Sequence, residues 1–93
     1  MRDKEEFYIK LKDSLKATTK FPSDYLYKFI VKTDEDKVIE IEELFKDKLV
    51  KISSNKSKTG KYISVSIKVK LQSADEVILY YRKAEKIEGI ISL

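Results

Sequence analysis

Residues 62–71 read YISVSIKVKL, and apolar and polar side chains alternate along this stretch without a break. Such alternation is typical of a β-strand that buries one face and exposes the other to water. The apolar set is Ile63, Val65, Ile67, Val69 and Leu71, and the polar set is Tyr62, Ser64, Ser66, Lys68 and Lys70. This strand therefore predicts an antiparallel sheet with one buried apolar face and one open, wet face.

Three other stretches predict the remaining strands. Residues 25–32 alternate as well: Tyr25, Tyr27, Phe29 and Val31 share one face, and Leu26, Lys28, Ile30 and Lys32 share the other. Residues 49–55 lead into a polar hairpin loop at 55–60, where Gly60 can adopt a positive φ angle. A short last strand follows Gly89 and reaches Leu93.

Three segments predict helices, at residues 3–19, 35–46 and 73–86. The residues that would cap their N-termini are Asp3 with Glu6, Thr33 or Asp34, and Ser73 with Glu76. The apolar stripes that would face the core are Phe7, Leu11 and Leu15; Val38, Ile41 and Phe45; and Val77, Tyr81 and Ala84. The stripe of the first helix is narrow, and Pro22 follows it, so we expect an appended helix that ends before the proline.

After the first helix, the predicted elements follow in the order βαββαβ. Because crossover connections are right-handed, this order folds as a ferredoxin-like split βαβ sandwich. We therefore predict an α+β fold, with a four-stranded antiparallel sheet, two helices on one face and an N-terminal helix. The chain divides into an appended helix at 1–20 and a ferredoxin-like domain at 21–93. Strands 25–32 and 62–71 are expected at the centre, and the second sheet face is open or covered by the first helix.

The composition argues against an enzyme. None of the 93 residues is a cysteine or a histidine, so thiolate chemistry and the usual general base are missing. Ser64 and Ser66 lie near Lys68, as in a Ser–Lys pair, but polar residues are expected on the open face of such a strand anyway. The acids at 34–36 do not match a calcium loop, and the dipole of the following helix explains them. We expect no catalytic residue, metal site or cofactor.

The sequence also predicts a cytoplasmic protein. Its first residues, Met-Arg-Asp-Lys-Glu-Glu, lack the apolar stretch of a signal peptide. No run approaches the roughly 20 apolar residues that a membrane span requires. We therefore expect no membrane contact.

Positive charge is concentrated in one part of the chain. The net charge is +4, but residues 51–71 contain lysines and no acid, whereas acids dominate residues 34–47. The lysines of this segment are Lys51, Lys56, Lys58, Lys61, Lys68 and Lys70. On the open face we predict a binding surface made of Lys28, Lys32, Tyr62, Ser64, Ser66, Lys68 and Lys70, with Leu26 and Ile30 for apolar contact. The alternative is that solvated lysines merely protect the sheet from aggregation.

Four motifs, in order and at matching spacing, resemble the YbeD-like family of small uncharacterised bacterial proteins. They are Phe21-Pro22-Ser23-Asp24-Tyr25-Leu26-Tyr27-Lys28, the stretch 54–66 (SNKSKTGKYISVS), the pair Tyr81-Arg82 and the apolar C-terminal strand. The resemblance covers about residues 21–93 and implies a ferredoxin-like fold close to ACT regulatory domains, without an assigned reaction. ACT domains that bind amino acids use a glycine-containing loop after the first strand. Here the loop at 32–36 has three acids and no glycine, and those acids would repel a ligand carboxylate.

Three functions are weighed on these grounds. We prefer a small non-enzymatic binding or regulatory module that acts through protein–protein contacts, with self-association as a homodimer expected. The alternative is an RNA-binding module that uses the basic hairpin at 51–71 and the open sheet, since RNA-recognition motifs share this topology and Gly60-Lys61-Tyr62 is similar to part of their third strand. However, Tyr27 is expected in the core, and serines follow Tyr62 on the open face, so few bases could stack there. An ACT-type small-molecule regulatory domain is the third hypothesis.

Overall fold

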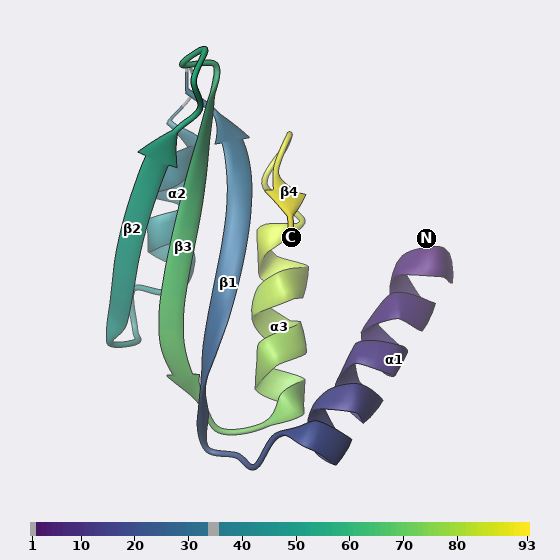
Figure 1. Ribbon diagram of the computed structural model, residues 1–93. Coiled ribbons are helices and arrows are strands. Elements are labelled where there is room, and N and C mark those ends of the chain that lie inside the picture. The colour runs from purple at the N-terminus through teal and green to yellow at the C-terminus, as the bar shows by residue number, and fades with distance from the viewer. Residues whose placement is uncertain (1, 34–35) are drawn as a thin grey trace.

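The computed structural model describes residues 2–33 and 36–93 of the chain, with side chains from residue 4 onward. Its elements, shown in Figure 1, are α1 (Arg2–Thr18), β1 (Ser23–Lys32), α2 (Lys37–Leu44), β2 (Val50–Lys56), β3 (Tyr62–Leu71), α3 (Ala74–Ala84) and β4 (Ile91–Ser92). The order and the class agree with the prediction: an α+β, ferredoxin-like fold preceded by a helix.

The four strands form one antiparallel sheet in the order β2-β3-β1-β4. The two long strands β1 and β3 are central, as predicted, and they pair without interruption from Ser23 opposite Leu71 to Lys32 opposite Tyr62. Residues directly opposite each other on paired strands project on the same side of a sheet. The register therefore places the apolar positions of β3 on the helix side with Tyr25, Tyr27, Phe29 and Val31 of β1, and the polar positions of β3 on the other side with Leu26, Lys28, Ile30 and Lys32.

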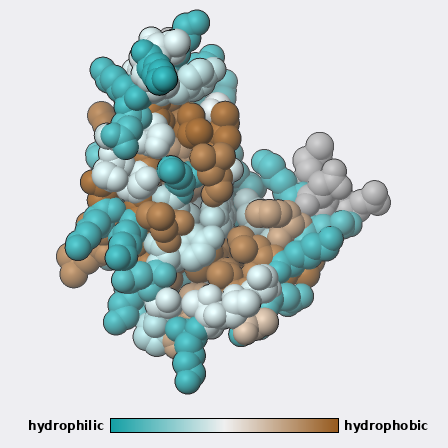
Figure 2. All heavy atoms as spheres, in the orientation of Figure 1, coloured by the Kyte–Doolittle hydropathy of each residue, from teal (hydrophilic) through white to brown (hydrophobic). Residues whose placement is uncertain are grey.

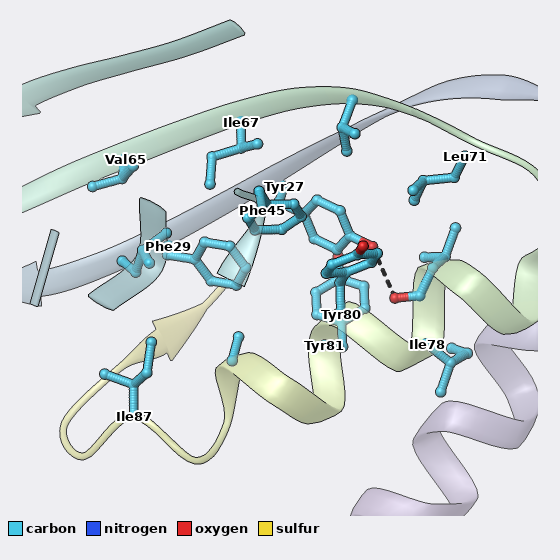
Figure 3. Close-up of a cluster of buried hydrophobic side chains, with 14 of the residues drawn as sticks. Tyr27, Phe29, Phe45, Val65, Ile67, Leu71, Ile78, Tyr80, Tyr81 and Ile87 are labelled. Atoms are coloured by element: carbon cyan, nitrogen blue, oxygen red, sulfur yellow. Dashed lines mark hydrogen bonds between the residues drawn. The ribbon is translucent and has the colours of Figure 1, made fainter. Parts of the chain in front are cut away.

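The core lies between the sheet and the two helices α2 and α3. Its fully buried members include Tyr27, Phe29, Ile41, Phe45, Val65, Ile67, Val69, Leu71 and Val77. The ring centroids of Tyr27 and Tyr81 lie 4.9 Å apart, and Figure 3 shows these rings between the sheet and α3. The hydroxyl of Tyr27 donates a 2.8 Å hydrogen bond to the carbonyl of Val77, which satisfies the one polar atom that this side chain brings into the core.

Ser73 is the N-cap of α3, as predicted, but the Glu76 side chain does not bond back to the Ser73 backbone N–H as in a capping box. The Ser73 hydroxyl accepts a 3.1 Å hydrogen bond from the backbone N–H of Glu76, as an N-cap should. The Glu76 carboxylate, however, accepts from the backbone N–H of Gln72 and from the ammonium group of Lys48. These contacts, led by the bond from Lys48, lower the pKa of Glu76 and tie α3 to the chain before β2.

The predicted cap of α2 is wrong at Thr33. The helix begins at Lys37, with Asp36 at the N-cap position, and it ends at Leu44 rather than at residue 46. Thr33 instead extends the pairing of β1 with β3: its N–H donates to the Lys61 carbonyl and its hydroxyl donates to the Gly60 carbonyl. Asp34, the other predicted cap, and Glu35 lie outside the described residues.

The predicted apolar stripe of α1 is also wrong in one residue. Phe7 is 58% exposed, whereas Tyr8 is 7% and Leu15 is 8% exposed. The buried face therefore follows positions 8, 11 and 15, because that face meets α3. The Tyr8 hydroxyl donates a 2.6 Å hydrogen bond to Glu85, the C-cap residue of α3. Asp3, part of the predicted capping pair with Glu6, has a side chain outside the described residues. As Figure 1 shows, α1 packs beside α3 and does not cover the second face of the sheet.

Candidate binding surface

The side of the sheet that faces away from α2 and α3, called the open face below, brings together all the predicted binding residues. The β1–β3 register places Lys28 opposite Ser66 and Lys32 opposite Tyr62. It also sets Ser64, Lys68 and Lys70 opposite Ile30, Leu26 and Asp24, respectively. The lysines are exposed, Tyr62 is 41% exposed, and the two serines are half-buried between their neighbours.

The two outer strands add residues to the open face that sequence reasoning missed. Strand β2 contributes Lys51, Ser53 and Asn55, which lie opposite Lys68, Ser66 and Ser64. On the other side, β4 places Ile91 opposite Ile30, and the N–H of Leu93 donates a 2.9 Å hydrogen bond to the carbonyl of Lys28. The sequence of β2 does not alternate clearly between apolar and polar residues, so only the hairpin register could have assigned its faces.

Several cations of the helix layer are paired with acids, whereas, among the described residues, the lysines of the open face are not. In the helix layer, Lys12 pairs with Asp75 at 2.6 Å, and Arg82 makes two hydrogen bonds to Glu5 at 2.7 and 2.8 Å. These hydrogen bonds lower the pKa of both Asp75 and Glu5. Within the described part of the chain, none of the open-face lysines forms an ion pair; they are Lys28, Lys32, Lys51, Lys68 and Lys70. Asp24, opposite Lys70, is the one acid at the open-face positions of the four described strands, so this face carries a net positive charge.

Apolar side chains lie among these lysines. Leu26 is 60%, Ile91 is 50% and Leu93 is 65% exposed, although large apolar side chains usually avoid water. Figure 2 looks onto this face and shows hydrophobic side chains near β1 and β4 with hydrophilic ones around them. The combination of an apolar patch with a charged surround is the arrangement found at many protein interfaces.

Two shallow hollows mark the two ends of the open face. One, of about 450 Å³, is lined by Lys32, Thr33, Gly60, Lys61 and Tyr62. The other, of about 310 Å³, is lined by Asp24, Leu49, Val50, Lys51, Lys68 and Lys70. Both contain at least two lysines, so positive charge extends along the length of the sheet.

Lysines lie beside the serines of this face, but no serine–lysine hydrogen bond forms among the described residues. The side chains of Ser64 and Ser66 make no hydrogen bond within the described residues, whereas an activated serine needs a base within about 3 Å. In the same part of the chain, no three acidic side chains gather as metal ligands would. None of the described helices combines the length and the apolar character that crossing a lipid bilayer requires.

Comparison with known proteins places the chain in a family. The family model described as a protein of unknown function, DUF493, matches residues 16–93. The chain belongs to this family. The match confirms the resemblance to the YbeD-like family and begins inside α1, so it leaves out most of that helix.

A solved structure supports the fold. The solution structure of protein HP0495 from H. pylori is similar, with a TM-score of 0.67 over 88% of this chain and 92% of that one. The two sequences are 22% identical, so this likeness concerns the fold alone. A search of curated proteins finds no match to the chain.

Proposed function

We propose that this domain is a non-enzymatic binding module whose open face recognises an acidic surface of a protein partner. The observation that carries the proposal is the cluster of lysines on the open face, none of which forms an ion pair within the described residues, whereas several cations of the helix layer are paired with acids. Unpaired exposed lysines create a positive potential that attracts acidic partners and speeds their association. Leu26, Ile91 and Leu93 supply apolar contacts beside that charge.

A second copy of the chain is one protein partner within this proposal. Two open faces repel each other because both are basic. The surface of a second copy that complements the open face is the region of α2, where Glu42 and Asp47 are exposed. Contact between two different surfaces is heterologous, so this form of self-association predicts rings or chains rather than a symmetric dimer.

RNA binding is the second candidate function, favoured by the same unpaired lysines together with Tyr62. Stacking of successive bases needs several aromatic side chains, and it contributes about 1–3 kcal/mol per base. Tyr62 is the one aromatic residue at the open-face positions of β1 and β3, because Tyr27 and Phe29 point into the core. A protein partner therefore fits this face better than a single-stranded RNA.

The proposal is tested with the double variant Lys28→Glu/Lys68→Glu, which reverses two charges at the centre of the open face. Its matched control is Lys10→Glu/Lys86→Glu, which makes the same change in net charge at exposed positions outside the sheet. Proteins captured from native extract by the wild type and by the control, but lost with the open-face variant, support the proposal. Their affinity for the purified domain should fall as salt rises, because exposed charges are screened over about 10 Å at 0.1 M salt.

Two results would refute it. Equal capture by both variants would move the binding surface away from the open face. Salt-dependent binding of polyuridylate that is lost only with the open-face variant, without a captured protein, would establish the RNA-binding function instead.

A further inference from the structure

Strand β2 forms an unpaired edge of the sheet. It pairs with β3 on one side, and no strand of the described residues pairs with its other side. Six of its seven residues are exposed, and Val50 is half-buried. Its pairing with β3 runs without a bulge from Val50 to Lys56, and the strand contains no proline. Such a straight edge can accept an additional strand.

The hydrogen-bond pattern shows which backbone groups of β2 point outward. The N–H of Ser57 donates a 2.8 Å hydrogen bond to the carbonyl of Tyr62, the residue that continues the β2–β3 register. In an antiparallel pair, every second residue bonds to its partner strand. The N–H and C=O groups of Lys51, Ser53 and Asn55 therefore point toward β3, and those of Val50, Ile52, Ser54 and Lys56 point away from the sheet.

The side chains of β2 give this edge a defined chemistry on each face. On the helix side, Val50 and Ile52 present aliphatic groups, and Ile52 is 38% exposed. On the open face, Lys51 is followed by Ser53 and Asn55, and no acid occurs anywhere in residues 51–71. In a strand added to this edge, the residue opposite Lys51 would form a non-hydrogen-bonded pair, in which side chains approach most closely.

We propose that β2 binds an extended segment of another protein as a fifth strand, and that aliphatic and acidic residues alternate in this segment. The aliphatic residues would pack beside Val50 and Ile52, and the acidic residues would face Lys51 and the lysines of β3. A second copy of β2 is a poorer occupant, since it would bring another lysine-bearing strand without acids alongside the first. This inference shares Lys51 and Lys68 with the surface proposed above, but protection of the outward amides of β2 distinguishes strand addition from binding at the centre of the open face.

The test uses blocked synthetic peptides and amide hydrogen exchange measured by NMR. The probe is (Val-Glu)4; the controls are (Val-Lys)4, which reverses the charge, and Val4Glu4, which keeps the composition but removes the alternation. In the free protein, the amides of Ile52, Ser54 and Lys56 should exchange rapidly, whereas those of Ser53 and Asn55 should be protected. Saturation with (Val-Glu)4 should slow the outward amides by about tenfold or more, and neither control should do so.

Two test variants and one control sharpen the result. Ser54→Pro removes one outward N–H and should weaken (Val-Glu)4 binding by about fivefold or more, while Ser54→Ala should bind like the wild type. Lys51→Glu should reduce the preference for (Val-Glu)4 over (Val-Lys)4, while the lysines of β3 remain in place. This charge exchange remains decisive if Ser54→Pro does not fold.

Three outcomes would overturn the inference. One is an absence of protection at millimolar (Val-Glu)4. Another is protection of the outward amides in the free protein that grows with protein concentration, which would identify a second copy as the occupant. The third is peptide binding that Lys51→Glu leaves unchanged, which would place the peptide elsewhere.

Discussion

The substitution Val65→Asp tests which side of β3 is buried, and its neighbour Ser64→Asp is the matched control. Val65 is fully buried at the centre of the sheet, opposite Phe29 on one side and Ser54 on the other. Ser64 is the preceding residue and projects onto the open face, beside Ile30 and Asn55. The same carboxylate is therefore placed in two different environments by a shift of one residue.

Val65→Asp lowers the free energy of unfolding through three separate costs. Losing the burial of a valine side chain costs about 1.5–3 kcal/mol. Aspartate has an ordinary pKa near 3.9, so keeping it protonated inside the core at pH 7 costs about 4 kcal/mol at about 1.36 kcal/mol per pH unit. An unpaired neutral carboxyl group adds about 1–3 kcal/mol. The sum is comparable to the whole stability of a small domain, about 5–15 kcal/mol, so Val65→Asp should be largely unfolded at pH 7.

Urea denaturation followed by circular dichroism measures this difference. Because burial raises the folded-state pKa of the introduced Asp, its penalty is greatest at neutral pH and shrinks as the pH falls toward 3.9. Val65→Asp should therefore recover stability relative to Ser64→Asp between pH 7 and pH 4. Ser64→Asp should stay within about 1 kcal/mol of the wild type at pH 7. A folded Val65→Asp protein beside an unfolded Ser64→Asp protein would mean that the two faces have been assigned the wrong way round.

Three further predictions concern single contacts. Tyr8→Phe removes the hydrogen bond to Glu85 and should lower the free energy of unfolding by about 1–2 kcal/mol in urea denaturation, whereas an unchanged value would mean that this bond does not anchor α1. Glu76→Gln should weaken the fall of melting temperature with falling acid pH. Lys48 lowers the folded-state pKa of Glu76 below 4.5, so the stability that this carboxylate contributes is complete above pH 4.5 and is lost as the pH falls through the lowered pKa. An equally steep loss of melting temperature at acid pH in the variant would contradict this role of Glu76. Gly60→Ala should cost about 1 kcal/mol through backbone strain alone, since φ is +74° and no heavy atom beyond the two neighbouring residues lies within 4 Å of the added carbon. Gly60→Asn should cost less, because asparagine tolerates positive φ, and equal losses would point to another cause.

The sequence was sufficient for the sheet wherever alternation was strict. Strand β3 was placed with the correct faces because its apolar and polar residues alternate strictly. On β1, Lys28 and Lys32 identified the open face although Leu26 and Ile30 lie on it too, and the register then brought the predicted binding residues together. Strand β2 lacked such a pattern, since Ser53, Ser54 and Asn55 follow one another. Its faces depend on its pairing with β3, which is a tertiary property.

The helices also depend on tertiary contacts that their own sequence patterns do not show. In α1, a stripe with four-residue spacing pointed to Phe7, but the buried residue is Tyr8. Its hydroxyl finds an acceptor on Glu85, 77 positions away in the sequence. A pattern within one helix cannot anticipate an acceptor on another helix. Of the two predicted caps of α2, Thr33 is wrong because it bonds to the hairpin loop instead.

The bonds from Thr33 to the hairpin loop have a consequence for recognition. The Thr33 hydroxyl reaches the Gly60 carbonyl at 2.6 Å, and its N–H reaches the Lys61 carbonyl at 3.0 Å, so the tip of the β2–β3 hairpin is tied to the end of β1. The backbone beneath the lysines of residues 51–70 is thus ordered before any partner arrives. Association then loses little backbone entropy, and the remaining loss is about 0.5–1.5 kcal/mol for each lysine side chain that becomes fixed. A hairpin with a free tip would have to be ordered during binding and would hold the same partner more weakly.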